Sequence, residues 1–161
     1  MLGMRVPNTY PIREATNADQ PAVWELISAV LHEYGITTDL RTTDADLADI
    51  EASYANEGRC FFVMLDGPRL IGTVALTRES DSSCQLCRMY LDSEYRRQGL
   101  GRLLLDKALQ EAKIRGFAEI HLRTAAVLVE AIRLYESIGF VRTSNVPVTK
   151  NCNLAMTKQL A

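Results

Sequence analysis

The sequence has little cysteine, no long apolar run and almost no net charge. Four cysteines in 161 residues are too few for a secreted disulfide scaffold, so we expect a reducing, cytoplasmic environment. No apolar stretch approaches the ~20 residues of a membrane span, and residues 1–11 lack the apolar core of a signal peptide. A net charge of −2 provides no overall positive field for nucleic acid or an anionic membrane, so we expect neither as a partner.

The rest of the composition is typical of one globular domain. Apolar residues make up 47% of the chain and charged residues 24%. A chain of roughly 150 residues buries enough surface for a core without disulfide or metal support. Residues 1–9 carry little pattern, so we expect them to form a flexible tail. There is no internal repeat, low-complexity stretch or linker, so we expect residues 10–161 to form a single domain.

The hydrophobic pattern predicts seven strands and four helices. Strands are expected over residues 10–15, 60–65, 70–76, 85–91 and 118–124, and in two further segments after Gly139. Helices are expected after the start signals Thr16-x-x-Asp19 and Thr43-x-x-Asp46, from Leu100 to Gly116, and over residues 129–138. The order β-α-α-β-β-β-α-β-α-β-β predicts the α/β class.

A glycine loop between the fourth predicted strand and the third predicted helix is the most informative segment. The first turn of a helix leaves backbone N–H groups unpaired, and the helix dipole places partial positive charge there. Gly99 and Gly101 remove side chains that would keep an anion away from these groups. Arg96, Arg97 and Arg102 add local positive charge. The segment therefore predicts a phosphate or pyrophosphate site.

The best-known nucleotide motifs do not fit this loop. A Rossmann fingerprint needs a third glycine three residues after the second, where Leu104 stands. A P-loop needs Gly-Lys-Ser/Thr after four residues, which this segment lacks. Without the flanking residues, a merely tight turn on a basic surface would explain the two glycines equally well.

The flanking residues resemble those of a known enzyme family. Arg96-x-x-Gly99-x-Gly101, four residues after Met89-Tyr90-Leu91, resembles the pyrophosphate signature of the GNAT acetyltransferase superfamily. The segment Ala131-Ile132-Arg133-Leu134-Tyr135-Glu136-Ser137-Ile138-Gly139-Phe140 resembles that family's Ala-x-x-Leu-Tyr-Glu-x-x-Gly-Phe helix. This resemblance extends over nearly the whole chain. It implies the GNAT fold, a mixed central sheet of about seven strands flanked by four helices.

The resemblance also implies a function and a cofactor site. It implies an N-acetyltransferase that moves acetyl from acetyl-CoA to an amine acceptor in a ternary complex, without a metal and often as a homodimer. Main-chain groups of Met89 and Leu91 would pair with the pantetheine arm. The pyrophosphate would lie on backbone N–H groups of the loop, at Arg96, Arg97, Gln98, Gly99, Leu100, Gly101 and Arg102.

Tyr135 stands where the family usually has a tyrosine beside the CoA sulfur, which implies a catalytic role. A free tyrosine has a pKa of ~10 and a thiol ~8.5, so complete proton transfer would be uphill by roughly 2 kcal/mol. A charge-assisted hydrogen bond to the departing thiolate is therefore the simpler role. The alternative is that Tyr135 packs in the core.

The family's usual general bases are missing. Many family members have an acidic residue in the fourth strand, where this sequence has Gln85. Another subset has Glu in the fifth strand and Asn five residues later, and these positions are Arg123 and Leu128 here. An amine of pKa ~10.4 needs ~4–5 kcal/mol to lose its proton at pH 7. Glu79 is a weak candidate, and we assign no base. The alternative function is accordingly a GNAT-fold module that binds CoA, as a sensor, without catalysis.

Other candidate residues carry weaker signals. Cys84 and Cys87 lie three apart in a predicted strand, so we expect them on opposite faces, and no second pair completes a metal or redox site. His32 lies between the first two helical segments, a region that caps the substrate side in GNAT proteins, so the resemblance implies that it could line an acceptor pocket; a solvated surface position is the simpler expectation. The same applies to His121.

Overall fold

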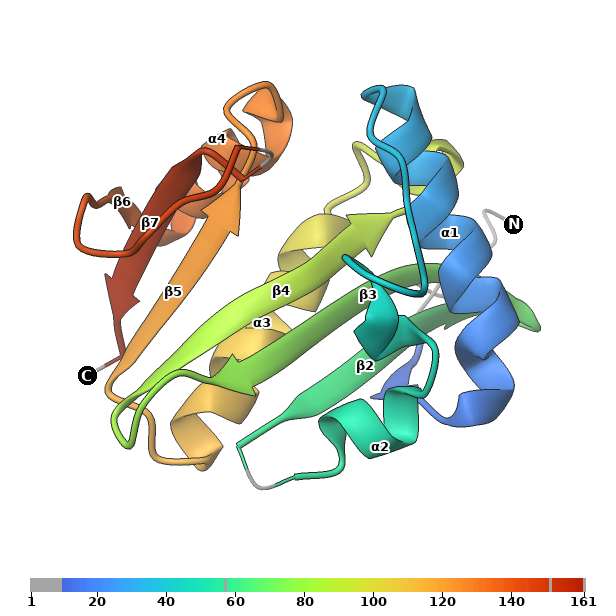
Figure 1. Ribbon diagram of the computed structural model, residues 1–161, viewed down its shortest axis with the longest axis horizontal. Coiled ribbons are helices and arrows are strands. Elements are labelled where there is room, and N and C mark those ends of the chain that lie inside the picture. The colour runs from blue at the N-terminus through green and yellow to red at the C-terminus, as the bar shows by residue number, and fades with distance from the viewer. Residues whose placement is uncertain (1–9, 57, 151, 161) are drawn as a thin grey trace, which may run out of the picture.

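The computed structural model describes residues 10–56, 58–150 and 152–160, which form an α/β domain around one sheet (Figure 1). The predicted tail at residues 1–9 lies outside the described residues. The strands are β1 (Ile12–Glu14), β2 (Cys60–Asp66), β3 (Arg69–Arg78), β4 (Ser83–Leu91), β5 (Glu119–Thr124), β6 (Val141–Arg142) and β7 (Leu154–Gln159). The helices are α1 (Gln20–Glu33), α2 (Ile50–Tyr54), α3 (Leu100–Ile114) and α4 (Val129–Ile138), with short 3-10 turns at Asn17–Asp19, Ala45–Leu47 and Ser93–Tyr95. The predicted element order is confirmed.

The sheet is mixed, as the resemblance implies. Its strand order is β1-β2-β3-β4-β5-β7-β6. The β4–β5 pair is parallel, and the other neighbouring strands are antiparallel. A parallel pair needs a crossover, and α3 supplies it between β4 and β5. The glycine loop consequently lies at the carboxyl end of β4.

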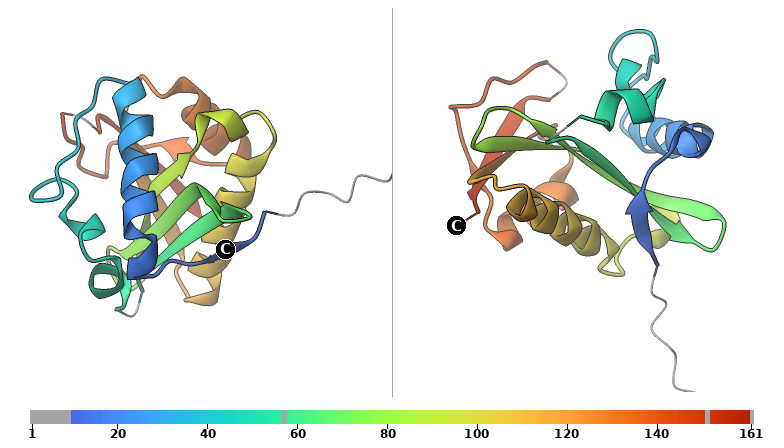
Figure 2. Two further views of the ribbon diagram at one scale, coloured as in Figure 1. Left: turned by 90° about the vertical axis from the view of Figure 1, so that its right-hand side faces the viewer. Right: turned by 90° about the horizontal axis from the view of Figure 1, so that it is seen from below.

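Helices cover both faces of the sheet (Figure 2). One hydrophobic cluster joins the sheet to α3 and α4, and a second joins it to α1 and α2. In α3, the buried residues recur at helical spacing; they are Leu100, Leu104, Leu105, Ala108, Leu109 and Ala112. Alternate strand residues supply the two clusters, so each cluster fixes the register of the strands it contacts.

The first predicted helix start is confirmed and the second is wrong. At the first, the Thr16 N–H donates to Asp19 Oδ2 at 2.8 Å, and α1 follows. At the second, α2 begins only at Ile50, where Asp49 accepts a hydrogen bond from the Ala52 N–H at 3.1 Å. Asp46 of the predicted Thr43-x-x-Asp46 signal does not cap a helix, because its carboxylate binds Arg88 on β4.

Candidate active site

The site is built on the separation of β4 and β5. Their parallel pairing runs only from Ser83–Glu119 to Leu86–Leu122. Beyond it, β4 continues to Leu91 and β5 to Thr124 without pairing to each other, and the two strands diverge in Figure 1. A cleft of ≈ 360 Å³ occupies this region.

The cleft reaches from one face of the sheet to the other. Leu104 of α3 and Tyr135 of α4 line it and belong to the cluster beneath those helices. Cys87 and Tyr90 of β4 also line it, and they pack against the cluster beneath α1 and α2. The cleft therefore allows two molecules to approach a common point from opposite sides of the sheet.

A bulge in β4 shapes the wall of this cleft. Arg88 has φ +52°, which is uncommon for a residue with a side chain, and the β3–β4 register shifts beside it. Its carbonyl accepts a hydrogen bond from Thr73 Oγ1 at 2.7 Å. Its guanidinium donates to Asp44 Oδ1 at 2.8 Å and, through Nε, to Asp46 Oδ2 at 3.1 Å. Hydrogen bonds on both sides thus hold the bulge in place.

The same ion cluster fixes the chain between α1 and α2 against the sheet. The side chains of Arg88 and Asp44 are 13% and 7% exposed. Burial alone would raise the pKa of Asp44, but hydrogen bonds from the Asp39 N–H and from Arg88 bring it below its usual value. Tyr54 donates its hydroxyl to Asp46, which ties α2 to the cluster as well. Asp44 therefore remains an ionised partner of Arg88 at neutral pH.

The glycine loop presents free backbone donors at one end of the cleft. Gly99 has φ +78° and precedes α3 as its left-handed N-cap, where a side chain would be strained. Among the described residues, the N–H groups from Arg97 to Arg102 have no hydrogen-bond acceptor. A Cβ on Gly101 would lie 3.3 Å from Leu134 Cδ2 of α4 and 4.0 Å from Met89 Cε. Gly101 therefore keeps open the space between α3, α4 and β4.

The arginines of this loop differ in how their charge is used. Arg96 forms an ion pair with Glu33 of α1 at 2.8 Å, and its Nε donates to the Leu91 carbonyl at 3.3 Å. Its charge is thus neutralised and holds the end of α1 to the loop, whereas the sequence suggested a free positive group. Arg97 and Arg102 have side chains that are 86% and 62% exposed. Each forms a longer and more exposed ion pair than Arg96, Arg97 with Glu130 at 3.6 Å and Arg102 with Asp106 at 3.9 Å, so their charges are held less tightly.

Tyr135 reaches the cleft from α4. The residue is 6% exposed, and its ring contacts Phe140 edge-on at a centroid distance of 5.8 Å. Its hydroxyl has a weak contact with Met89 Sδ at 3.9 Å. Burial raises the pKa of Tyr135 above its usual value, so the hydroxyl stays protonated. The Tyr135 hydroxyl is therefore a neutral hydrogen-bond donor at the cleft, and its present acceptor, Met89 Sδ, is a weak one.

Residues 23–140 match the family model described as acetyltransferase (GNAT) family. The chain belongs to the GNAT acetyltransferase family. Relatives of this acetyltransferase carry names of the same kind. It is 34% identical over 139 residues to the Escherichia coli (strain K12) protein named uncharacterized N-acetyltransferase YjgM, covering 83% of each chain. It is 35% identical over 129 residues to human N-acetyltransferase 8, which is 76% of this chain. The chain spans only 55% of that human protein's length.

Solved structures of GNAT proteins share the fold. An acetyltransferase of the GNAT family from Staphylococcus aureus Mu50 has a TM-score of 0.84 at 26% identity, covering 94% of this chain and 99% of that one. The acetyltransferase yncA from Salmonella typhimurium, solved with its cofactor acetyl-CoA, has a TM-score of 0.72 at 27% identity and 94% coverage of both chains. The protein is therefore an N-acetyltransferase of the GNAT fold. None of the helices that the structure describes is long and apolar enough to cross a membrane.

The structure brings most of the predicted site residues of this acetyltransferase to one cleft. Its lining includes Met89, Leu91, Arg96, Arg97, Gly99, Leu100, Gly101, Arg102 and Tyr135. Gln98 is exposed and does not line it. Of the positions considered for a base, Arg123 and Leu128 line the cleft, whereas Gln85 borders a neighbouring recess beneath α2. Glu79 forms an ion pair with Arg123 at 3.2 Å.

The remaining candidates lie outside the cleft or on separate faces. Cys84 is buried in the cluster with α3, and Cys87 packs against the cluster with α1 and α2, so the expectation of opposite faces is confirmed. His32 is exposed and does not line the cleft. His121 pairs in register with Gln85, and its Nδ1 lies 3.5 Å from Glu119 Oε1.

Sequence reasoning missed the residues that shape the bulge. Thr73, Asp44, Asp46 and Arg88 are far apart in the chain, and no motif joins them. One signal was available: a charged residue, Arg88, stands inside an otherwise weakly polar strand. An ionic side chain in such a strand needs a partner.

Proposed function

We propose that this N-acetyltransferase moves the acetyl group of acetyl-CoA to the amine of a small-molecule or peptidic acceptor, by direct attack in a ternary complex. The observation that carries the proposal is the cleft between β4 and β5, which is open to both faces of the sheet and ends at a row of free N–H groups. Residues 10–161 would act as one catalytic domain.

The cofactor half of the proposal rests on the glycine loop. Backbone N–H groups of the loop, at Arg96, Arg97, Gln98, Gly99, Leu100, Gly101 and Arg102, would hold the pyrophosphate of acetyl-CoA. Main-chain groups of Met89 and Leu91 would pair with the pantetheine arm. The Leu91 carbonyl already accepts a hydrogen bond from Arg96. We therefore assign the carbonyl that would accept from the pantetheine arm to Met89.

The chemical half rests on Tyr135. Attack of the amine on the thioester carbonyl expels the CoA thiolate, and the Tyr135 hydroxyl would donate a hydrogen bond to it. Because burial raises the pKa of Tyr135, complete proton transfer to a thiolate is even less favourable than between free groups. The hydroxyl therefore stabilises the leaving group by a charge-assisted hydrogen bond.

The amine must reach the cleft in its neutral form. Gln85 and Arg123 stand where family members have acids, and Glu79 is engaged with Arg123. We therefore assign no general base, and the cost of ~4–5 kcal/mol for deprotonating an amine of pKa ~10.4 is left to water or to the acceptor itself. The second candidate function, a CoA-binding sensor, follows from this same lack of an acid.

Two measurements test the proposal and separate these functions. Acetyl-CoA should raise the melting temperature, because a ligand that binds only the native state stabilises it by mass action. A panel of amines should then release free CoA thiol from acetyl-CoA at a rate that depends on the enzyme. A thermal shift without turnover of any amine would favour the sensor, and the absence of both would refute the cofactor site. A cytoplasmic location and a homodimer are further predictions, checked by fractionation and light scattering.

A further inference from the structure

Arg123 occupies the face of the cleft opposite α3 and α4. Side chains along β5 alternate between the two faces of the sheet, and those of Ile120 and Leu122 are buried in the cluster with α3. Arg123 therefore projects to the other face, and it lines the cleft there. If the pyrophosphate is held at the start of α3, the acceptor approaches from the face that carries Arg123.

The guanidinium of Arg123 is held in one orientation but is not saturated. Its Nε donates to the Pro147 carbonyl at 2.7 Å, and its Nη1 donates to Glu79 Oε1 at 3.2 Å. These bonds use two of the five N–H groups of an arginine. The side chain is 20% exposed. The Arg123 guanidinium is thus fixed at the cleft with N–H groups that have no acceptor among the described residues.

Charges of both signs line this side of the cleft and its neighbouring recess. Arg88 is paired with Asp44 and Asp46, and Arg123 with Glu79. Because carboxylates pair with both arginines, this side of the cleft carries little net positive charge, and a molecule with one positive and one negative group suits it better than a strongly anionic acceptor. A planar guanidinium suits a carboxylate, which can accept two parallel N–H bonds.

We propose that Arg123 binds a carboxylate of the acceptor, and that the acceptor is an amino acid or a similar compound with its amine close to a free carboxylate. This inference rests on the proposed function. Arg123 would anchor the carboxylate, and the neighbouring amine would point into the gap between β4 and β5. Glu79 and the Pro147 carbonyl hold the guanidinium in place and act as positioning groups.

The test compares matched acceptors on the same enzyme. Each amino acid is assayed beside its amide and its decarboxylated amine, with free CoA thiol as the readout and kcat/KM as the measure. We expect the wild-type protein to prefer the carboxylate form by about ten- to hundredfold, the effect of hydrogen bonds to a charged group. Equal kcat/KM for acid and amide in the wild-type protein would refute the inference while leaving the proposed function intact. No turnover of any amine would refute the proposed function, and the inference with it.

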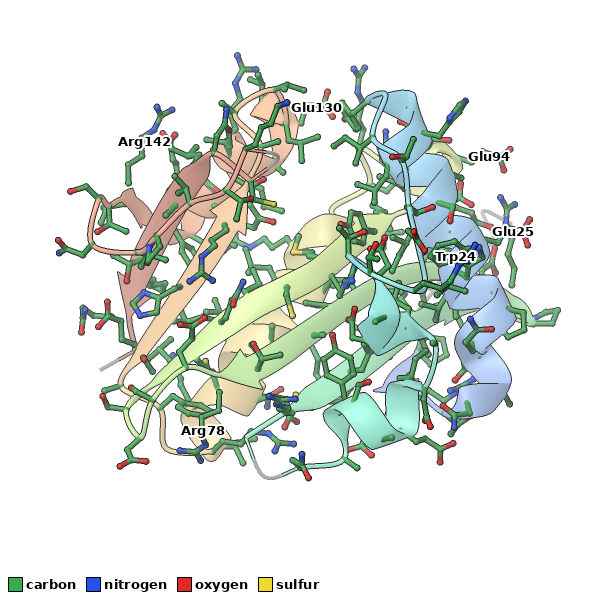
Figure 3. All side chains as sticks on the ribbon, viewed as in Figure 1. Trp24, Glu25, Arg78, Glu94, Glu130 and Arg142 are labelled. Carbon is green, nitrogen blue, oxygen red and sulfur yellow. The ribbon has the colours of Figure 1, made fainter. Side chains whose placement is uncertain are left out.

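Variants of Arg123 test whether this residue causes the preference for the carboxylate form of the acceptor. Arg123→Gln should remove it, raising KM for the acid and leaving KM for acetyl-CoA unchanged, and Arg123→Lys should restore part of it. Arg142→Gln is the matched control, because Arg142 is 65% exposed and lies at the outer edge of the sheet, away from the gap between β4 and β5 (Figure 3). If Arg123 only positioned the chain around Pro147, Arg123→Gln would lower kcat/KM for acid and amide by the same factor, and the inference would be wrong.

Discussion

The replacement Tyr135→Phe separates a catalytic hydroxyl from a packing ring. The ring stays, so the contact with Phe140 is kept, and a single hydroxyl is removed. A hydrogen bond to a charged group contributes roughly 1.5–3 kcal/mol. If the hydroxyl acts on the departing thiolate, this corresponds to an about ten- to hundredfold loss of kcat. KM for acetyl-CoA should change little, because the bond forms mainly in the transition state.

The structure predicts a separate and opposite result for stability. Within the part of the chain that the structure describes, this hydroxyl has only the weak contact with Met89 Sδ at 3.9 Å, so the replacement removes a buried polar group with a poor partner. The melting temperature of Tyr135→Phe should therefore stay the same or rise, by an amount equivalent to at most about 1 kcal/mol.

Kinetics and thermal melting on the same preparation measure both quantities. A kcat within twofold of wild type, with chemistry shown to be rate-limiting, would remove Tyr135 from the catalytic residues. A large fall in melting temperature would show instead that the hydroxyl serves the fold. Because burial raises the pKa of Tyr135, the wild-type kcat should not decline through ionisation of this group between about pH 7 and 9.

Three further changes test other parts of the structure. Arg88→Ala should lower the free energy of unfolding by about 3 kcal/mol in urea titrations, because Asp44 would stay buried without its partner; the exposed control Arg97→Ala should change it by less than about 0.5 kcal/mol. Gly101→Val should fold but lose the thermal shift given by acetyl-CoA, since the new side chain enters the cleft near Leu134 and Met89; an undiminished shift would contradict this. Asp19→Asn should cost about 1 kcal/mol at pH 7. Because the hydrogen bond from Arg13 lowers the pKa of Asp19, this stabilisation exists above the ordinary carboxyl pKa of ~3.9 and is lost as the pH falls through the lowered value. Wild type and variant should thus converge in acid melts.

Local patterns were sufficient to predict the element order. Helical spacing predicted α3, and the predicted range 129–138 matches α4. The structure adds that Gly99 and Gly139, at the boundaries of these helices, have positive φ. The loop and Tyr135 could be placed because each motif lies within one short segment. Their meeting in one cleft follows from the crossover between β4 and β5, which the order of elements already implied.

Contacts between distant segments could not be predicted in this way. Arg88 and Asp44 are 44 positions apart, and Arg96 and Glu33 are 63 apart. Counting charge in the loop therefore overstated the positive charge available, because Glu33 already neutralises Arg96. The helix start at Thr43 failed for the same reason: the carboxylate of Asp46 binds Arg88 instead of capping a helix.

The short pairing of β4 with β5 also divides the molecule mechanically. Four strands, β1 to β4, lie on one side of the junction and three, β5 to β7, on the other, joined within the sheet by a few residue pairs at one end. Such a junction allows the two half-sheets to pivot about their joined end at a smaller cost than that of bending a continuous sheet, because few hydrogen bonds resist the motion. Any molecule that touches β4 and α4 together bridges both halves. Filling the cleft would therefore stiffen the sheet as a whole.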